Sequence, residues 1–311
     1  MRQLSLVVVL AALAGCTTGN RIDPDGGAQP TPDSGPDGGT TPVPDSGPVP
    51  DGGPRLDDVL IYAHSRDTLY TFSAYTNTVT EIGDFRTASG DDAPPVLDLA
   101  VDSAGVVFIS TDDSRDSEAM LFRVDPLTAV VTPVGEIVLD DPNERLFALS
   151  FLAPSESPDG TEVHVGATNG VAGEGAAVYA VDRTDASAEF LGFYPDGWFS
   201  SGDIVSVDGL GTYATLRSTD ASFPGDVLAR ILFSASGATS VIVIGPVKSA
   251  TEDFRQIFGL GYWGRNLFGF SNSGQLIRIN RETGAGTVVS TATGADSFWG
   301  AGVTVDVPFL F

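Results

Sequence analysis

The stretch LFRVDPLTAVVTPVG, residues 121–135, predicts a β-strand, a tight turn and a second β-strand. The same frame recurs at residues 69–83, 178–192 and 276–290. Each copy begins with an apolar residue and closes 14 positions later (121 to 135, for example) with Gly or Ser. A fifth copy at residues 228–245 carries three additional residues. Five copies of one hairpin predict an array of repeated supersecondary units.

A second pair of short apolar runs precedes most of the hairpins, and the first run of each pair has a large-small-large pattern. The runs with this pattern are 99–101 (Leu-Ala-Val), 149–151, 205–207, 260–262 and 301–303. The last run has no hairpin after it, whereas the hairpin at Leu69 is preceded only by the strand-like run Val59–Ala63. Small middle residues suit inner strands that crowd a central channel. The sequence therefore predicts an all-β propeller of five four-stranded blades, closed by a C-terminal strand that joins the N-terminal blade.

Three segments of different composition follow one another along the chain. Residues 1–16, MRQLSLVVVLAALAGC, contain one basic residue, an apolar run and small residues before a cysteine. This pattern predicts a signal peptide, too short to span a membrane. Residues 17–54 are rich in Pro, Gly, Asp, Ser and Thr, and such a composition predicts a disordered linker because it cannot bury a core. Residues 55–311 contain every hairpin and predict the propeller domain.

The only cysteine, Cys16, ends the sequence Leu13-Ala14-Gly15-Cys16, which resembles the lipobox of bacterial lipoproteins. This resemblance implies cleavage before Cys16 and a diacylglyceryl group on its thiol, which would anchor the exported protein in the cell envelope. Thr17 replaces the Asp that retains enterobacterial lipoproteins at the inner membrane, so the resemblance implies the outer membrane. The Pro/Gly/Asp-rich linker is similar in composition to the stalks of myxobacterial surface lipoproteins.

The segment Leu97–Ser110, LDLAVDSAGVVFIS, resembles one strand-turn-strand unit of the NHL and related propeller families. The resemblance implies the propeller fold and no activity. The metal and catalytic residues of related lactonases have no matching positions in this sequence.

The composition excludes several classes of function. The chain has 41 acidic and 16 basic residues and a net charge of −25, so it repels the phosphates of nucleic acids. A single cysteine rules out an intramolecular disulfide and a cysteine-based zinc site. His64 and His164 are the only histidines, which excludes a multi-histidine metal site, and we expect each to be a packed or a surface residue of a strand.

In a propeller, the loops after the second strand of each blade and the loops between blades share one face, here called the loop face. It comprises residues 65–68, 84–95, 111–119, 140–145, 168–176, 195–202, 218–226, 248–255 and 271–274. Because these connections are the longest and most varied, we expect them to form the binding face. Its candidate residues are Arg66, Arg115, Trp198, Asp112, Asp113 and Asp116. The three aspartates could also bind Ca²⁺ through oxygen ligands. The alternative is a solvated acidic rim with no cofactor.

Three hypotheses for function remain open. The first is a non-enzymatic module that binds protein or glycan. The second is a glycoside hydrolase like other five-bladed propellers, which would need two carboxylates about 5 to 9.5 Å apart. Asp98 and Asp203 are the best pair available, although they do not occupy matching positions in the repeat. The third is a purely structural envelope protein.

Overall fold

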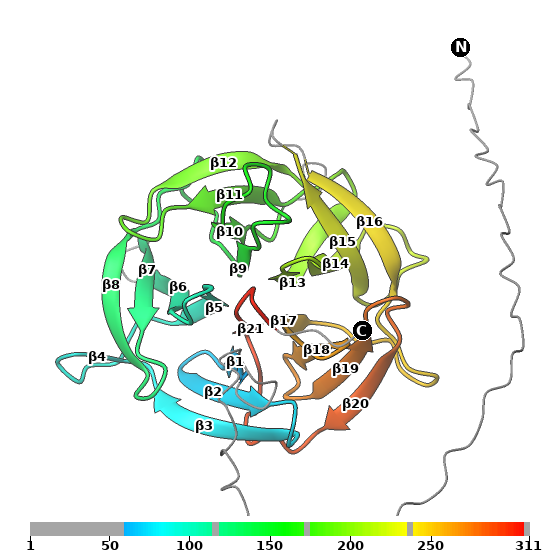
Figure 1. Cartoon of the computed structure of the whole chain (residues 1–311), viewed down its shortest axis with the longest axis horizontal. Coiled ribbons are helices and arrows are strands. Elements are labelled where there is room, and N and C mark those ends of the chain that lie inside the picture. Colours follow the sequence, from blue (N-terminus) through cyan, green and yellow to red (C-terminus); the bar gives the residue numbers. More distant parts are fainter. Residues whose placement is uncertain (1–58, 114–117, 171–174, 235–238, 308–311) are drawn as a thin grey trace, which may run out of the picture. The chain divides into compact units, whose positions relative to one another are not determined.

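The computed structural model describes residues 59–113, 118–170, 175–234 and 239–307, which belong to the unit Gly52–Phe311. Cys16, the signal peptide, the linker, Arg115 and Asp116 lie outside these residues. Within the described ranges every regular element is a β-strand. The strands form five antiparallel sheets arranged as blades around a common centre (Figure 1), so the predicted five-bladed propeller is confirmed.

From the inner to the outer strand, each blade follows the predicted order. Blade 1 contains β21 (Gly300–Gly302), β1 (Ile61–His64), β2 (Thr68–Ser73) and β3 (Thr78–Asp84). Blade 2 contains β5 (Val96–Val101), β6 (Val107–Asp113), β7 (Glu118–Val124) and β8 (Val130–Glu136). Blade 3 contains β9 (Ala148–Leu152), β10 (Val163–Ala167), β11 (Ala177–Val181) and β12 (Ala188–Phe193). Blade 4 contains β13 (Trp198–Val207), β14 (Gly211–Ser218), β15 (Val227–Phe233) and β16 (Thr239–Pro246). Blade 5 contains β17 (Ile257–Trp263), β18 (Asn266–Ser271), β19 (Leu276–Asn280) and β20 (Gly286–Ser290).

Blade 2 has a fifth strand that the sequence did not predict. The short strand β4 (Arg86–Thr87) lies in the connection between blades 1 and 2, and it pairs in parallel with Val130 and Val131 of β8. The blade-joining chain therefore covers part of the outer edge of blade 2, which would otherwise expose unpaired backbone groups.

The repeated hairpin forms the two outer strands of every blade, and its closing small residue has a structural reason. In all five hairpins this residue pairs with the first apolar residue, and the strand register shifts directly after that pair. A Cβ at Gly135 would collide with the carbonyl oxygen of Asp185, and a Cβ at Gly245 would lie 2.5 Å from the carbonyl oxygen of Thr283. Asp185 and Thr283 belong to the hairpin turns of the following blades. At these two positions the glycine lets the next blade approach closely.

The C-terminal strand β21 closes the ring as predicted. It pairs antiparallel with β1, with Gly302 opposite Tyr62, Ala301 opposite Ala63 and Gly300 opposite His64. In Figure 1, β21 lies beside β1 at the centre of the ring. The first blade is therefore built from both ends of the domain, an arrangement that leaves no open edge between the first and last blades.

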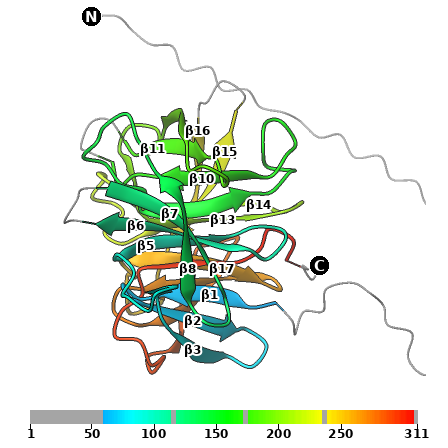
Figure 2. The same ribbon diagram turned by 90° about the vertical axis from the view of Figure 1, so that its left-hand side faces the viewer.

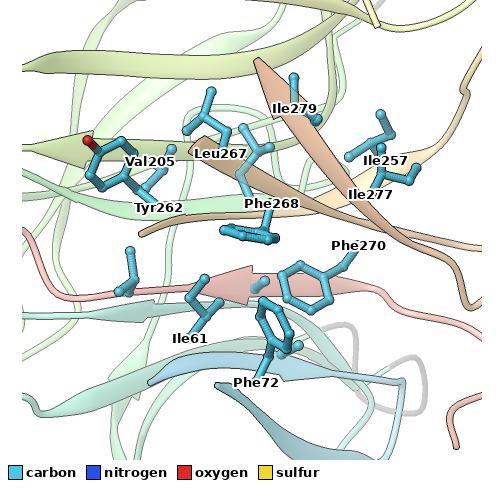
Figure 3. Packing of buried hydrophobic residues seen from close by; sticks show 14 of the residues in the cluster. Ile61, Phe72, Val205, Ile257, Tyr262, Leu267, Phe268, Phe270, Ile277 and Ile279 are labelled. Atoms are coloured by element: carbon cyan, nitrogen blue, oxygen red, sulfur yellow. The ribbon is translucent and has the colours of Figure 1, made fainter. Parts of the chain in front are cut away.

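Neighbouring blades pack through buried aromatic and aliphatic side chains. Between blades 1 and 5, Phe72 packs against Phe268 and Phe270, with ring centroids 5.1 and 5.9 Å apart (Figure 3). The small middle residues of the inner strands make room for this packing. A Cβ at Gly261 would lie 2.5 Å from Ile61 Cγ2. Ile61 lies in β1, the second strand of blade 1, and a Cβ at Gly302 of β21 would lie 2.8 Å from Leu99 Cδ1 of β5. At these two positions the small middle residue lets an inner strand approach the neighbouring blade closely.

Candidate functional site

Asp98 of β5 and Asp203 of β13, the candidate catalytic pair, lie at the centre of the ring with no exposed surface. Asp98 accepts hydrogen bonds from the amides of Leu99 (2.8 Å) and Leu149 (2.6 Å). Asp203 accepts them from the amides of Ile204 (2.6 Å) and Leu260 (2.5 Å), and also from Ala301. The two side chains are hydrogen-bonded to each other.

The five amides bound by this central carboxyl pair come from five different inner strands. Leu99, Leu149, Ile204, Leu260 and Ala301 belong to β5, β9, β13, β17 and β21, one from each blade. Asp98 and Asp203 play the same role although their positions in the repeat differ by one residue. An irregularity of the strand register between Ser200 and Ile204 accompanies this offset. The pair therefore joins all five blades through hydrogen bonds with backbone amides.

Burial determines the protonation of the central carboxyl pair. Loss of solvent raises the pKa of Asp98 well above its usual range, and the adjacent charge of Asp203 raises it further. Burial also raises the pKa of Asp203, although its hydrogen bonds with backbone amides oppose this shift. Two adjacent buried carboxyls cannot both ionise at low cost, so the pair favours a state in which at least one of them is protonated.

The geometry of the pair differs from that of a glycosidase. Hydrolysis needs two carboxyls separated by about 5 to 9.5 Å with the glycosidic bond between them. Here the carboxyls contact each other directly, and neither is exposed. The backbone of Gly300 lies so close to Asp98 that a Cβ at this position would collide with Asp98 Oδ1 and with His64 Nε2. This leaves no room for a substrate beside the Asp98 carboxyl on that side.

Both histidines are buried packing residues of strands. His64 hydrogen-bonds through Nδ1 to the carbonyl oxygen of Ser65, and its Nε2 lies 3.8 Å from Asp98 Oδ1, beyond hydrogen-bonding distance. His164 stacks on Phe151 with the ring centroids 4.5 Å apart. Burial lowers the pKa of His64 to about 4, and burial and the nearby Arg183 charge lower the pKa of His164 to about 3. Both rings are therefore neutral at pH 7.

The two sets of loops do meet on one face, as predicted. Figure 2 views the ring edge-on, with connections emerging at either side. Arg145, from the loop between blades 2 and 3, donates from Nε to Asp112 at the end of β6, at 2.9 Å. Trp198, at the start of β13, packs against Phe223 of the loop after β14, with ring centroids 5.8 Å apart. Each contact joins a blade-joining loop to a loop that follows a second strand.

Among the described residues, the structure does not gather the predicted binding residues into one site. Trp198 is half-buried and Arg66 is exposed. The carboxylate of Asp112 is engaged by Arg145. Asp113 ends β6, and Arg115 and Asp116 lie outside the described residues. Within the described part of the chain, no three His, Cys, Asp or Glu side chains cluster as they would around a metal ion.

A pocket of about 460 Å³ on the loop face was not predicted from the sequence. It lies between the loop after β14 and the loop before β17. Its lining residues are Arg217, Ser218, Phe223, Pro224, Gly225, Asp226, Arg255 and Gln256. Its Phe223 is the ring that packs on Trp198, so the pocket adjoins the predicted aromatic residue. We call this the arginine pocket.

Asp226 shapes one wall of the arginine pocket. Its side chain is buried and accepts hydrogen bonds from the amides of Ile257 (2.8 Å) and Gln256. Gln256 has a φ of 54°, in the left-handed region that non-glycine residues rarely adopt. Such a conformation persists only where the surroundings enforce it, and it is frequent at binding sites.

No family model matches the chain, and no curated protein sequence is similar to it. Among solved structures, hydrazine synthase from Kuenenia stuttgartiensis is 13% identical with a TM-score of 0.41, over 73% of this chain and 74% of that chain. The Dos1 propeller is 8% identical with a TM-score of 0.37, over 75% and 55%. Exo-β-1,3-galactanase from Phanerochaete chrysosporium is 12% identical with a TM-score of 0.42, over 76% and 60%. This chain thus covers less than two thirds of the last two proteins. These likenesses carry no conclusion about function.

No helix among the described residues has the length and apolar character needed to cross a membrane.

Proposed function

We propose that this protein is a lipid-anchored component of the bacterial cell envelope, and that its propeller is a non-enzymatic module that binds protein or glycan. The observation that carries the proposal is the arginine pocket, a concave site with charged, aromatic and amide side chains on the loop face. Small-molecule and glycan sites combine such a cavity with a few polar groups. The rigid blades hold the loops that line it in fixed positions.

The central carboxyl pair favours binding over hydrolysis. Its hydrogen bonds are used to join the five inner strands, and its carboxyls touch each other without solvent access. A glycosidase would present two separated carboxyls to the substrate. We therefore infer that the carboxyl pair stabilises the ring and that the loop face binds the ligand.

The proposed anchor is Cys16, and the linker would hold the propeller away from the membrane. At about 3.1 Å per residue for a polyproline II conformation, roughly 30 residues could reach up to about 100 Å. The Cys16→Ser variant should lose the lipid and leave the detergent phase in a phase-partition assay. Partitioning equal to that of the wild type would contradict the lipoprotein assignment.

The binding proposal is tested by screening the full-length protein in detergent on a glycan array and against isolated envelope proteins. We expect a ligand whose binding is weakened by Trp198→Ala. Tyr75→Ala is the matched control, because Tyr75 is an aromatic residue with 67% exposure in the hairpin turn of blade 1, on the opposite face. Tyr75→Ala should keep the melting temperature of the wild type. Trp198→Ala should lower it, because Trp198 packs against Phe223 and the core, so binding is compared at a temperature at which both variants are folded. Equal effects of the two substitutions, or no ligand among glycans and envelope proteins, would contradict the proposal.

A further inference from the structure

The arginines of the arginine pocket differ from Arg86 and Arg145 on the loop face. Arg86 pairs with Asp84 and Asp92, and Arg145 pairs with Asp112. Arg217 donates from Nε to the carbonyl oxygen of Ser200 at 3.3 Å. It forms no direct ion pair among the described residues, although its charge opposes the burial-induced rise in the pKa of nearby Asp226. Arg255 is exposed and likewise has no carboxylate partner within the described ranges.

Arg217 and Arg255 form no direct ion pair among the described residues, although the chain has a net charge of −25. Most anions are repelled by such a protein, so a pocket that retains two guanidinium groups creates a local exception. The only carboxylate in the pocket lining is Asp226, which is buried, bound to backbone amides and close to the Arg217 charge. Two guanidinium groups thus accompany one carboxylate. The lining therefore has an excess of positive charge, and it favours a negatively charged ligand.

The remaining lining residues narrow the class of ligand. Phe223 provides an apolar wall, and its ring is held by the contact with Trp198. Gln256 offers a side-chain amide, and its backbone amide, in the left-handed conformation, donates to Asp226. Ser218 adds a hydroxyl group. A sugar ring has an apolar face that can pack on an aromatic wall, and hydroxyls that bond to amide and hydroxyl groups.

We propose that the arginine pocket binds an acidic saccharide, with the carboxylate of a uronic acid held by Arg217 and Arg255. The guanidinium group matches a carboxylate through two parallel hydrogen bonds, and Arg is preferred wherever this geometry matters. The volume of about 460 Å³ is within the range of small-molecule sites. This inference rests on the proposed binding function and specifies its ligand.

The test is calorimetric titration of the full-length protein in detergent with trigalacturonate, and with galactotriose as the neutral sugar of equal length. We expect trigalacturonate to bind and galactotriose to bind at least about tenfold more weakly, because bonds to a charged group contribute more. Arg217→Gln and Arg255→Gln should each weaken trigalacturonate binding by at least about tenfold. Binding should also weaken as salt is added.

The matched control is Arg278→Gln, which removes one positive charge from an exposed position of β19 outside the pocket. It should leave the affinity unchanged, and all three variants should keep the wild-type melting temperature. Equal binding of the two sugars, or equal losses in all three variants, would overturn the inference. If a neutral glycan or a protein binds and trigalacturonate does not, the acidic ligand is wrong while the binding function stands. If nothing binds, both are wrong.

Discussion

Replacing Asp203 by alanine should destabilise the whole ring, because Asp203 binds amides from three blades. The substitution removes the acceptor for the buried amides of Ile204, Leu260 and Ala301. Each buried donor left without a partner costs about 1 to 3 kcal/mol, so the three together cost about 3 to 9 kcal/mol. Domains are typically stable by only about 5 to 15 kcal/mol. We therefore expect Asp203→Ala to unfold at a far lower denaturant concentration than the wild type, or to fail to fold.

The Asp98→Asn variant separates the role of the hydrogen bonds from that of the proton. Asparagine keeps one oxygen acceptor and can still donate to Asp203, so we expect a smaller loss of about 1 to 3 kcal/mol. Because burial raises the pKa of both carboxyls, the stability that they contribute is fully present below the unfolded pKa. It is lost as pH rises through the folded pKa. The free energy of unfolding of Asp98→Asn should therefore fall less than that of the wild type as the pH rises.

Both variants are measured by urea unfolding followed by circular dichroism from pH 4 to pH 9. Asp226→Ala is a useful comparison, because Asp226 is also buried and bound to backbone amides but lies at the arginine pocket rather than at the centre. A loss below about 1 kcal/mol in Asp203→Ala would refute the role of the pair in joining the blades, since a single buried amide without a partner costs at least that much.

Three further predictions follow from the fold. Deleting residues 297–311 removes β21 from blade 1, so cooperative thermal unfolding should be lost and aggregation should increase; an unaltered melting curve would contradict the closure. Burial lowers the pKa of His64 from 6.5 to about 4 and that of His164 from 6.5 to about 3. The free energy of unfolding contributed by each neutral ring is therefore fully present above pH 6.5 and is lost as the pH falls through the folded pKa. The loss is about 3 kcal/mol for His64 and about 5 kcal/mol for His164. The free energy of unfolding of His164→Phe, measured against pH, should fall less steeply below pH 6.5 than that of the wild type. An equal fall in both proteins would contradict this role of His164. Gly261→Val should destabilise the contact between blades 5 and 1, because its side chain would overlap Ile61, by about 1 to 3 kcal/mol; a wild-type denaturation midpoint would contradict this.

The fold was predictable because its signals lie within short stretches of sequence. The hairpin frame reflects a small residue at the register shift of each outer strand pair, as Gly135 and Gly245 illustrate. The closure of the ring by β21 was predictable because Gly302 is the small middle residue of an inner strand without a following hairpin. The short strand β4 was not, since two residues that pair in parallel with a distant strand leave no periodic pattern.

The site was less predictable, because it depends on contacts between distant loops. The repeat placed Asp98 and Asp203 near the starts of inner strands but not in matching positions. In the structure the strand register is irregular at both places, between Val96 and Asp98 and between Ser200 and Ile204. Trp198 was identified as a loop-face aromatic, whereas Arg217 and Arg255 carry no local motif. They meet only because the loop after β14 and the loop before β17 are adjacent in the ring.

The central claim, that the propeller binds without chemical turnover, is tested most directly by one measurement on one sample. Trigalacturonate is incubated with the full-length protein, and bound sugar and newly formed reducing ends are quantified together. We predict that the sugar is captured and that reducing ends form no faster than in a sample without protein. Release of reducing ends by the wild type, with the release lost in the Asp98→Asn variant, would contradict the claim and establish a hydrolase.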